Sequence, residues 1–391
     1  MKVYFWGNTN HNNLHYLRVL YFFSSIETKL FTHGDVGMNS ADQGSKNKYA
    51  EIPASYHVWK EPYTLSFLFP FKLVWKMKEA DVNQVSNRYI VPAYLAYKLF
   101  GIPYLFIPYG DDFCNLPFGN GGYYSYKGAW AFLGRYFAMC MRKAIKACPL
   151  FIIRYLDRSY LDALSILEIS PCDSRIKKIP TPLDFKDYSD SIETHEDVFS
   201  VFMPTRILWE LDSSDDKGSG IMIHGFAMFR KSNPDKKIIL KLIRRGPHLK
   251  KADALICKLC IADDVIWLPE MGRDELISHY RSSDAVFDQI GLGRGSSGMV
   301  TVEGMIYGKP VFVYQCPCVD RDLGKPPIVN VRNENDIKIN LQKVMDGDWK
   351  SSGAAKKWAK QYDYEHVAKI YIPLLEELAR GQKGTIGKVK Y

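Results

Sequence analysis

The sequence predicts an α/β protein with two domains, each built on a parallel β-sheet that helices cover. Short apolar runs typical of strands alternate with helical patterns along the whole chain, as they do in parallel sheets. The chain has 391 residues, which is too long for one compact core and suits two domains of roughly 180 residues each. The acidic segment Asp190–Val198 interrupts the pattern and is the predicted linker. We therefore expect a first domain over residues 1–189 and a second over residues 199–364.

The first half contains six segments that we expect to be strands. They are Lys2–Trp6, a run near Lys29–Thr32, Val82–Val85, Tyr104–Pro108, Leu150–Ile153 and Arg175–Ile179. A helical pattern runs from Arg88 to Phe100 and stops at Gly101, because glycine commonly ends helices.

The second half repeats the alternation. Its expected strands are Ser200–Met203, Lys237–Ile243, Val265–Leu268, Ala285–Gln289 and Pro310–Tyr314. Its expected helices are Gly220–Lys231, Lys250–Leu259, Arg273–Ser282 and Met299–Tyr307. Residues 365–391 are expected to form a long amphipathic helix, Glu365–Arg380, that packs back toward the first domain, followed by a tail.

Charge and composition limit the classes of partner. Hydrophobic residues make up 47% of the chain and the formal net charge is +9, which indicates a globular protein that favours anionic partners. Nucleotide phosphates and acidic lipid headgroups are such partners. The sequence has neither zinc-finger spacing nor an RNA-recognition motif, so we do not expect nucleic acid to be a partner.

The start of the chain lacks the apolar stretch of a signal peptide, and no apolar run is long enough to span a bilayer. We therefore expect a cytoplasmic protein whose eight cysteines are reduced and mostly buried. The pairs Cys257-x-x-Cys260 and Cys316-x-Cys318 together have the number of thiols that zinc needs. The first pair also fits the core face of a helix, and we predict no metal site.

The segment from Asp288 to Tyr314, DQIGLGRGSSGMVTVEGMIYGKPVFVY, is the most informative part of the chain. It joins a strand end, a glycine-rich turn, a helix and a second strand, an order that builds phosphate sites at helix N-termini. Glu303 lies about one turn into the helix, where its carboxylate can accept hydrogen bonds from two ribose hydroxyls. An ordinary strand, turn and helix with an exposed glutamate is the alternative.

Parallel sheets bind ligands in a cleft at the carboxyl ends of their strands. In the second half, the polar loops that directly follow strands carry Arg206 and Lys217. Both suit a diphosphate, because a guanidinium offers a fixed fork to two phosphate oxygens and an ammonium offers a mobile point charge. Each is also explained as a solvated surface cation.

Several motifs resemble one known family. In the second half they are Met203-Pro-Thr-Arg206, Lys217-Gly218, Arg245-Gly246-Pro247, VIWLPEMGRDELISHYRSSDAVFDQ, Glu303-Gly-Met and Gly308-Lys-Pro310. They resemble the nucleotide-sugar domain of family 4 glycosyltransferases, which are retaining enzymes of the GT-B architecture. In the first half, weaker matches follow in the right order at Gly101-Ile-Pro103, Pro108-Tyr-Gly-Asp-Asp112 and Ile179-Pro-Thr-Pro-Leu-Asp184. The resemblance implies two Rossmann-like domains whose parallel sheets face each other across a cleft.

The resemblance also implies a reaction. A sugar would pass, with retention, from a nucleotide diphosphate sugar that carries UDP or GDP to a saccharide or lipid-linked acceptor of a cell-surface polysaccharide or glycolipid. Arg206 and Lys217 would neutralise the leaving diphosphate and Glu303 would hold the ribose. The residues implied for donor binding are Arg206, Lys217, Gly246, Pro269, Met271, Ser296, Ser297, Gly298, Met299 and Glu303. No cofactor or metal ion is implied, since the two cations and the helix end supply the positive charge.

The first domain would then hold the acceptor. Asn10 and His11 lie in an amide-rich first loop, and amides suit hydroxyl-rich ligands because they both donate and accept. A plain Asn-rich turn explains that loop equally well. Asp111 and Asp112 follow a strand and are candidates for positioning an acceptor hydroxyl, with Asp112 as the candidate catalytic base, although a helix cap also explains one of them.

Residues 63–78, YTLSFLFPFKLVWKMK, mix aromatic residues, leucines and lysines without a carboxylate. Such a segment can lie on the inner face of a membrane, with its rings at headgroup depth and its lysines on anionic lipid. A buried helix whose lysine stems reach outward is the alternative.

The chain departs from the family pattern in two places. The segment WELDSSDD, between Arg206 and Lys217, is longer and more acidic than usual. The family typically has a second glutamate eight residues before the one that binds ribose, and here that position is Gly295. The departure at Gly295 leaves a second hypothesis, in which the chain is a catalytically silent protein of the same fold that binds a glycan or serves as a partner subunit.

Overall fold

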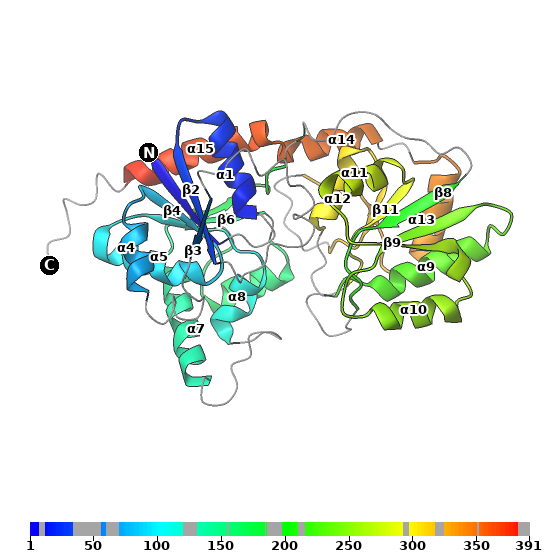
Figure 1. Ribbon diagram of the computed structural model, residues 1–391, viewed down its shortest axis with the longest axis horizontal. Coiled ribbons are helices and arrows are strands. Elements are labelled where there is room, and N and C mark those ends of the chain that lie inside the picture. Colours follow the sequence, from blue (N-terminus) through cyan, green and yellow to red (C-terminus); the bar gives the residue numbers. More distant parts are fainter. Residues whose placement is uncertain are drawn as a thin grey trace. The chain divides into compact units, whose positions relative to one another are not determined.

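The computed structural model describes residues 1–7, 12–33, 56–59, 70–119, 131–154, 156–183, 185, 198–209, 216–291, 297–316, 324–349 and 352–381. These residues form two compact units (Figure 1). The first unit takes the chain up to Leu183 and again from Tyr362 onward, and the second takes the described residues between these points. Most of the expected linker lies outside the described residues.

The first unit contains a parallel sheet in the order β3-β2-β1-β4-β5-β6-β7. Its strands are β1 (Lys2–Trp6), β2 (Glu27–His33), β3 (Tyr56–Trp59), β4 (Val82–Val85), β5 (Tyr104–Phe106), β6 (Leu150–Ile153) and β7 (Ile176–Lys178). Its α-helices are α1 (Asn12–Phe23), α4 (Phe71–Met77), α5 (Ile90–Phe100), α6 (Asp111–Cys114), α7 (Ala131–Lys146), α8 (Arg158–Ile166) and α15 (Tyr364–Gly381).

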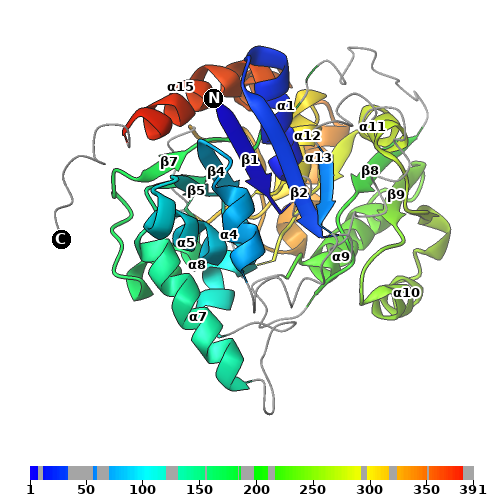
Figure 2. The same cartoon turned by 60° about the vertical axis from the view of Figure 1, so that its left-hand side comes forward.

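The central strand β1 is buried on both faces, as strands of parallel sheets are. Val3 and Phe5 lie in a core with residues of α1 and α15, whereas Tyr4 and Trp6 lie in a second core with residues of α4, α5 and α7. Successive side chains of a strand point to opposite faces, which is why one strand serves both cores. Figure 2 shows the two helical layers on either side of this sheet.

Helix α15 belongs to the core of the first unit although the second unit precedes it in the chain. Its buried residues include Val367, Tyr371 and Leu375, which recur at the spacing of one helix face. The chain leaves the first unit after Leu183 and returns to it at Tyr362. These two segments are hydrogen-bonded to each other, since the Leu183 amide donates to the Tyr362 carbonyl at 2.7 Å. Two adjacent crossings therefore connect the units.

The second unit contains a parallel sheet in the order β10-β9-β8-β11-β12-β13. Its strands are β8 (Phe199–Met203), β9 (Ile238–Ile243), β10 (Val265–Leu268), β11 (Ala285–Phe287), β12 (Val311–Val313) and β13 (Val329–Asn330). Its α-helices are α9 (Ser219–Lys231), α10 (Leu249–Lys258), α11 (Arg273–Arg281), α12 (Met299–Ile306), α13 (Glu334–Met345) and α14 (Ser352–Ala359). Helices α9, α10 and α13 supply residues to the main core, and α12 packs with α14.

Every expected strand is present, with ends that shift by one or two residues. The strand expected over Ala285–Gln289 ends at Phe287, which leaves Asp288 and Gln289 beyond its carboxyl end. Strands β3 and β13 and helices α1, α6, α7, α8, α13 and α14 are additional to the predicted elements.

Candidate functional site

The strand order of the second sheet places its candidate residues at one point. The chain adds β9 and β10 on one side of β8 and then returns to add β11, β12 and β13 on the other side. The loops after β8 and β11 therefore diverge at the carboxyl edge, the place where open parallel sheets bind ligands. Arg206 and Lys217 lie between β8 and α9, and Asp288 and Gln289 directly follow β11.

The loop after β8 is fixed by the loop after β9. The Ile207 amide donates to the Arg245 carbonyl at 2.7 Å. Gly246 has a φ of +126°, and a Cβ on it would lie 2.3 Å from the Ile207 carbonyl oxygen, so glycine is required there. These contacts place Gly246 beside the backbone next to Arg206, whose side chain is exposed. The sequence-predicted residues Arg206 and Gly246 are thus brought together.

Thr205, which sequence reasoning did not select, lies in the same loop. Its side chain is buried, and its hydroxyl has no hydrogen-bond partner within the described residues. A buried hydroxyl without a partner is costly, so such a group marks a place where a ligand or water completes the hydrogen bonding. In the sequence, the only feature that points to Thr205 as a site residue is its position next to Arg206.

Lys217 lies against the residues that follow β11. Its ammonium donates to Gln289 Oε1 at 2.5 Å, and its carbonyl accepts from the Ile290 amide at 3.0 Å. The next residue, Gly218, has a φ of +67°, and a Cβ there would lie 2.7 Å from the amide nitrogen of Gly291. Close backbone packing therefore holds Lys217 beside the residues that follow β11, at the switch point of the sheet.

The N-terminus of α12 is occupied by a carboxylate of the chain itself. Asp288 is buried, and its Oδ2 accepts from the Gly298 amide at 2.6 Å, the Thr301 amide at 3.2 Å and the Thr301 hydroxyl at 2.5 Å. We expected unpaired amides of this helix to face a phosphate. That expectation is wrong for Gly298 and Thr301, because Asp288 caps the helix and places a negative charge at its positive end.

Glu303 is buried in α12 rather than exposed. Its Oε2 accepts a hydrogen bond of 2.7 Å from the hydroxyl of Tyr280, a buried residue of α11. The Tyr280 ring packs in turn against Phe202 of β8 and Tyr307. The alternative of an ordinary exposed glutamate is therefore wrong, and Tyr280 is a partner that the sequence did not reveal.

The remaining donor-binding candidates are distributed around this edge. Ser297 is buried next to Gly298 and Met299, whereas Ser296 and Gly295 lie outside the described residues. Pro269 is exposed after β10, two strands from β8, and Met271 is buried. The Arg244 amide donates to the Leu268 carbonyl at 2.8 Å, so the loops after β9 and β10 are joined near Pro269.

The first sheet has its own switch point, between β1 and β4. Asn13, at the start of α1, donates from Nδ2 to the Gly7 carbonyl at 2.6 Å and to Ser86 Oγ at 3.4 Å. It accepts from Gln84 Nε2 at 2.9 Å. Asn13 therefore connects the loops after β1 and β4. The amide-rich segment GNTNHNN contains four asparagines, and the sequence did not indicate which of them has this role.

Asp112 occupies a structural position at the same edge. Its side chain is buried, Oδ1 accepts from the Tyr109 amide at 2.7 Å, and Oδ2 accepts from the Asn87 amide at 2.9 Å. Asn87 has a positive φ of 58°, a conformation that such a bond stabilises. Both carboxylate oxygens thus hold loops together, which favours a structural role for Asp112 over that of a catalytic base. Asn10, His11 and the side chain of Asp111 lie outside what the structure describes.

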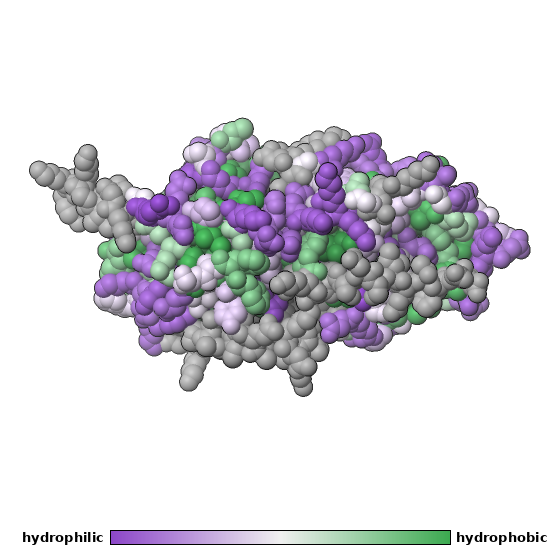
Figure 3. All heavy atoms as spheres, turned by 90° about the horizontal axis from the view of Figure 1, so that it is seen from above, coloured by the Kyte–Doolittle hydropathy of each residue, from purple (hydrophilic) through white to green (hydrophobic). Residues whose placement is uncertain are grey.

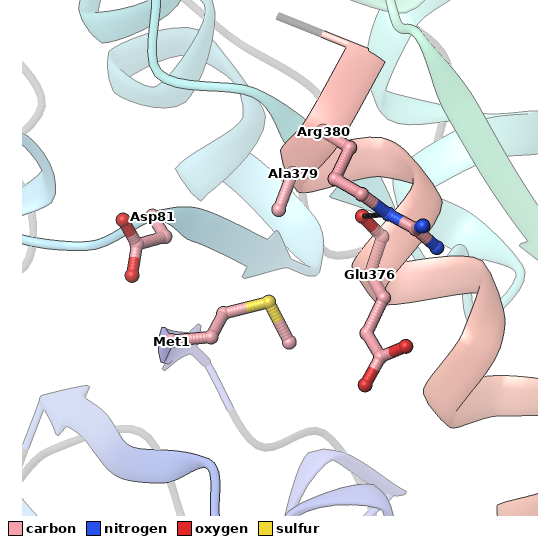
Figure 4. A pocket seen from close by; sticks show the side chains of 5 residues that line it. All are labelled: Met1, Asp81, Glu376, Ala379 and Arg380. Carbon is pink, nitrogen blue, oxygen red and sulfur yellow. Dashed lines mark hydrogen bonds between the residues drawn. The ribbon is translucent and has the colours of Figure 1, made fainter. Parts of the chain in front are cut away.

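One cavity lies elsewhere in the first unit. It has a volume of about 440 Å³ and is lined by Met1, Asp81, Glu376, Ala379 and Arg380 (Figure 4). Met1 and Asp81 precede β1 and β4, so the cavity is at the amino ends of the strands, opposite to the edge that carries the candidate residues. It contains none of the predicted site residues.

Within the described residues, no group of three or more His, Cys, Asp or Glu side chains could hold a metal ion. The cysteines correct one expectation, because Cys172, Cys257 and Cys260 are exposed and Cys316 is disulfide-bonded, whereas Cys148 is buried as expected. None of the described helices has the length and apolar composition needed to cross a bilayer.

No protein-family model and no curated protein sequence matches the chain. Solved structures match it over almost its whole length. Anabaena Alr3699/HepE, solved in complex with UDP and glucose, has a TM-score of 0.67 and 15% identity, and the match covers 96% of this chain and 99% of that chain. The lipopolysaccharide outer core galactosyltransferase WaaB, in its apo form, has a TM-score of 0.63 and 16% identity over 96% and 99% of the two chains.

Sucrose-phosphate synthase from Thermosynechococcus elongatus is also similar, with a TM-score of 0.61 and 12% identity over 97% of this chain and 100% of that chain. At such identities the comparison establishes the fold and not the activity. The chain has the GT-B fold, with two Rossmann-like units, and the predicted fold class is confirmed.

Proposed function

We propose that this chain is a glycosyltransferase that moves a sugar from a nucleotide diphosphate sugar to a saccharide or lipid-linked acceptor in the synthesis of a cell-surface glycan. The observation that carries the proposal is the placement of Lys217 against Gln289 at the switch point of the second sheet, with Arg206 on the neighbouring loop. Two cations at the carboxyl edge of a Rossmann-like sheet suit a diphosphate. The similar HepE structure holds UDP and glucose.

In the proposed donor complex, the diphosphate lies between Arg206 and Lys217. The Lys217 ammonium has three N–H donors, so it can bind a phosphate oxygen while it keeps its hydrogen bond to Gln289. Glu303 accepts from the ribose hydroxyls, and its bond to the Tyr280 hydroxyl fixes the orientation of the carboxylate. The Thr205 hydroxyl, which has no hydrogen-bond partner among the described residues, is a further candidate for a phosphate contact.

The proposed reaction retains the configuration of the sugar, as in family 4. The bond between the sugar C1 and the diphosphate oxygen breaks, a bond from C1 to the acceptor oxygen forms on the same face, and the acceptor proton passes to the departing diphosphate. Charge develops on the leaving oxygens, so Arg206 and Lys217 stabilise the transition state more than the ground state. Because these cations do so, we expect turnover to persist in the presence of a chelator.

The proposal does not use Asp112 as the base, since backbone amides occupy both of its oxygens. It places acceptor binding in the first unit, at the edge where Asn13 joins the loops after β1 and β4. It also keeps the expected cytoplasmic location, with residues 63–78 on the inner face of a membrane. Of these, residues 63–69 lie outside the described residues and α4 forms most of the remainder.

Titration calorimetry with UDP, GDP and ADP tests the proposal. We expect one nucleotide to bind, and to bind at least roughly tenfold more tightly than its 2′,3′-dideoxy analogue. The analogue lacks both hydroxyls, and losing even one charge-assisted hydrogen bond costs about 1.5 kcal/mol or more. In Glu303→Ala the ribose hydroxyls should no longer contribute to affinity, so the nucleotide and its 2′,3′-dideoxy analogue should bind equally tightly. If no nucleotide binds the wild-type chain, the proposal fails.

Turnover of a sugar nucleotide distinguishes an enzyme from the catalytically silent alternative, for which the comparisons offer no support. Sugar nucleotides that remain bound through purification identify the donor to use. Slow hydrolysis of that donor by the purified chain, lost in Lys217→Ala, would exclude a silent protein. A chain that binds the nucleotide but never cleaves it would instead favour that alternative.

A further inference from the structure

Three helices form one layer on the face of the first sheet that lies away from α1 and α15. Helix α5 packs against both α4 and α7, so the three are neighbours (Figures 1 and 2). None of their residues is acidic. The basic residues among them are Lys72, Lys76, Lys98, Arg135, Arg142, Lys143 and Lys146.

The same layer exposes large apolar side chains. Phe132 is 72% exposed and Tyr136 is 57% exposed, one helical turn apart on α7. On α4, Phe71 is 71% exposed and Trp75 is 59% exposed, and Leu99 of α5 is 64% exposed. Exposing several large apolar side chains to water on one surface is unfavourable, and such clusters commonly mark surfaces that bind a protein, a ligand or a membrane.

Rings and cations are interleaved in this layer. The Lys78 ammonium lies 4.7 Å from the ring centroid of Trp75 and 4.8 Å from that of Phe100, and the two rings are 5.3 Å apart. Acidic residues lie next to the layer, where Glu79 pairs with Lys76, Glu168 pairs with Lys146, and Asp162 is exposed on the neighbouring helix α8. Among the described residues, Lys98 and Lys143 have no ion-pair partner.

The opposite layer of the same sheet provides a comparison. Helix α15 exposes Glu365, Glu376 and Glu377, and Glu365 pairs with Lys369 at 2.8 Å. Figure 3 views the side of the molecule that carries α15, where hydrophilic residues are interspersed with hydrophobic patches. The acid-free composition is therefore a property of the α4–α5–α7 layer and not of the whole unit.

We propose that the layer formed by α4, α5 and α7 binds the surface of a bilayer that contains anionic lipid. Aromatic rings are favourable at headgroup depth, and each basic residue near an anionic leaflet strengthens binding about fivefold. A protein partner with an apolar groove would match the rings, but it would not explain the absence of acids throughout the layer. This proposal extends the contact expected for residues 63–78 to α5 and α7, and it does not depend on the proposed transferase activity.

Flotation of the full chain with vesicles tests the proposal. We expect binding to phosphatidylcholine vesicles that contain phosphatidylglycerol, little binding to phosphatidylcholine alone, and release as salt is raised, because exposed charges are screened. Equal binding to both vesicles, or no binding at low salt, would overturn the proposal. Binding to neither vesicle together with salt-resistant self-association would point to a protein partner instead.

Variants locate the surface. Phe132→Ser with Tyr136→Ser should weaken vesicle binding by roughly tenfold or more, whereas Tyr21→Ser with Phe22→Ser, which removes rings exposed on α1, should not. Lys98→Ser with Lys143→Ser should weaken it about 25-fold at low salt. The matched control, Lys250→Ser with Lys258→Ser, removes the same charge from α10 of the second unit.

If the variants and their controls behave alike, this layer is not the binding surface. Nucleotide affinity, measured on the same variants, should stay at the wild-type value, because none of the substituted residues lies at the carboxyl edge of the second sheet. A chain that fails to bind vesicles but still binds nucleotide would therefore reject this proposal alone.

Discussion

At the scale of single residues, the candidate donor site is built from polar side chains that other side chains already hold. Gln289 holds Lys217, Tyr280 holds Glu303, and Asp288 holds the first turn of α12. Such supporting bonds fix the geometry of a site before a ligand arrives, which lowers the cost of ordering it on binding. The site residues therefore act as pairs, and we expect a substitution of either residue of a pair to reduce function.

Lys217→Met tests the role of the ammonium. Methionine keeps much of the apolar stem but removes the charge, so the developing charge on the leaving diphosphate loses one of two cations. We expect kcat to fall about a hundredfold, roughly 3 kcal/mol of transition-state stabilisation. Steady-state kinetics with the identified donor provide the measurement. Lys250→Met, on α10, is the control and should keep wild-type turnover.

Tyr280→Phe tests whether Glu303 needs its partner. The substitution removes only the hydroxyl that donates to Glu303 Oε2, and the ring contacts with Phe202 and Tyr307 remain. We expect the preference for a nucleotide over its 2′,3′-dideoxy analogue to shrink from wild type and to vanish in Glu303→Ala. A merely structural tyrosine would weaken both ligands equally, so an unchanged preference would contradict a positioning role.

Residue-level contacts were harder to predict than residue types. The sequence indicated Arg206 and Lys217 because they lie in a loop that follows a strand, and Glu303 because it lies about one turn into a helix. It did not indicate that Asp288 caps α12, because that bond spans the ten positions from Asp288 to Gly298 and depends on how the glycine-rich turn closes. Asn13 was missed for a similar reason, since its partner Ser86 follows a different strand.

At the scale of elements, the packing of α9 against α13 depends on one small residue. A Cβ on Gly225 of α9 would lie 2.6 Å from Cβ of Ile337 on α13. Gly225→Ala should therefore push the helices apart and lower the free energy of unfolding by about 1–3 kcal/mol, although alanine is the better helix former. Urea denaturation followed by circular dichroism measures this.

Gly353→Ala in α14 is the matched control, because a Cβ there meets no atom within 4 Å. We expect it to leave stability unchanged or to raise it by about 0.4–1 kcal/mol. Equal destabilisation by both substitutions would show that helix contact is not the cause.

Strands and helices were predicted correctly where a run of apolar residues was long enough to show the spacing typical of a strand or a helix. The strands β1, β4, β6 and β10 have the predicted bounds. Strand β13 was missed because it spans only Val329–Asn330, too short for any periodicity to register. Strand β3 was missed because Tyr56–Trp59 has four residues in a long polar context, and its pairing with β2 is a non-local contact that the sequence does not display.

At the scale of the whole molecule, both units wind their sheets in two directions from a central strand. The reversals between β1 and β4 and between β8 and β11 place polar loops at the carboxyl edges. The alternation of strands and helices predicted two such sheets, because it leaves few other topologies open. The strand orders themselves follow from the pairings, which the sequence alone did not specify.

Helix α15 comes after the second unit in the chain but packs in the core of the first unit, which it should stabilise. Leu375 is buried in the core that contains Val3 and Phe5 of β1, whereas Ile370 on the same helix is 43% exposed. Leu375→Ala should lower the stability of the first unit by about 2–5 kcal/mol, and Ile370→Ala should change it by less than about 1 kcal/mol. Hydrogen exchange should show faster exchange in β1, β4 and β5 of Leu375→Ala than in the wild-type chain, with β8, β9 and β11 unaffected. Equal loss of protection in both sheets would contradict the assignment of α15 to the first unit, because every described core contact of Leu375 is made within that unit.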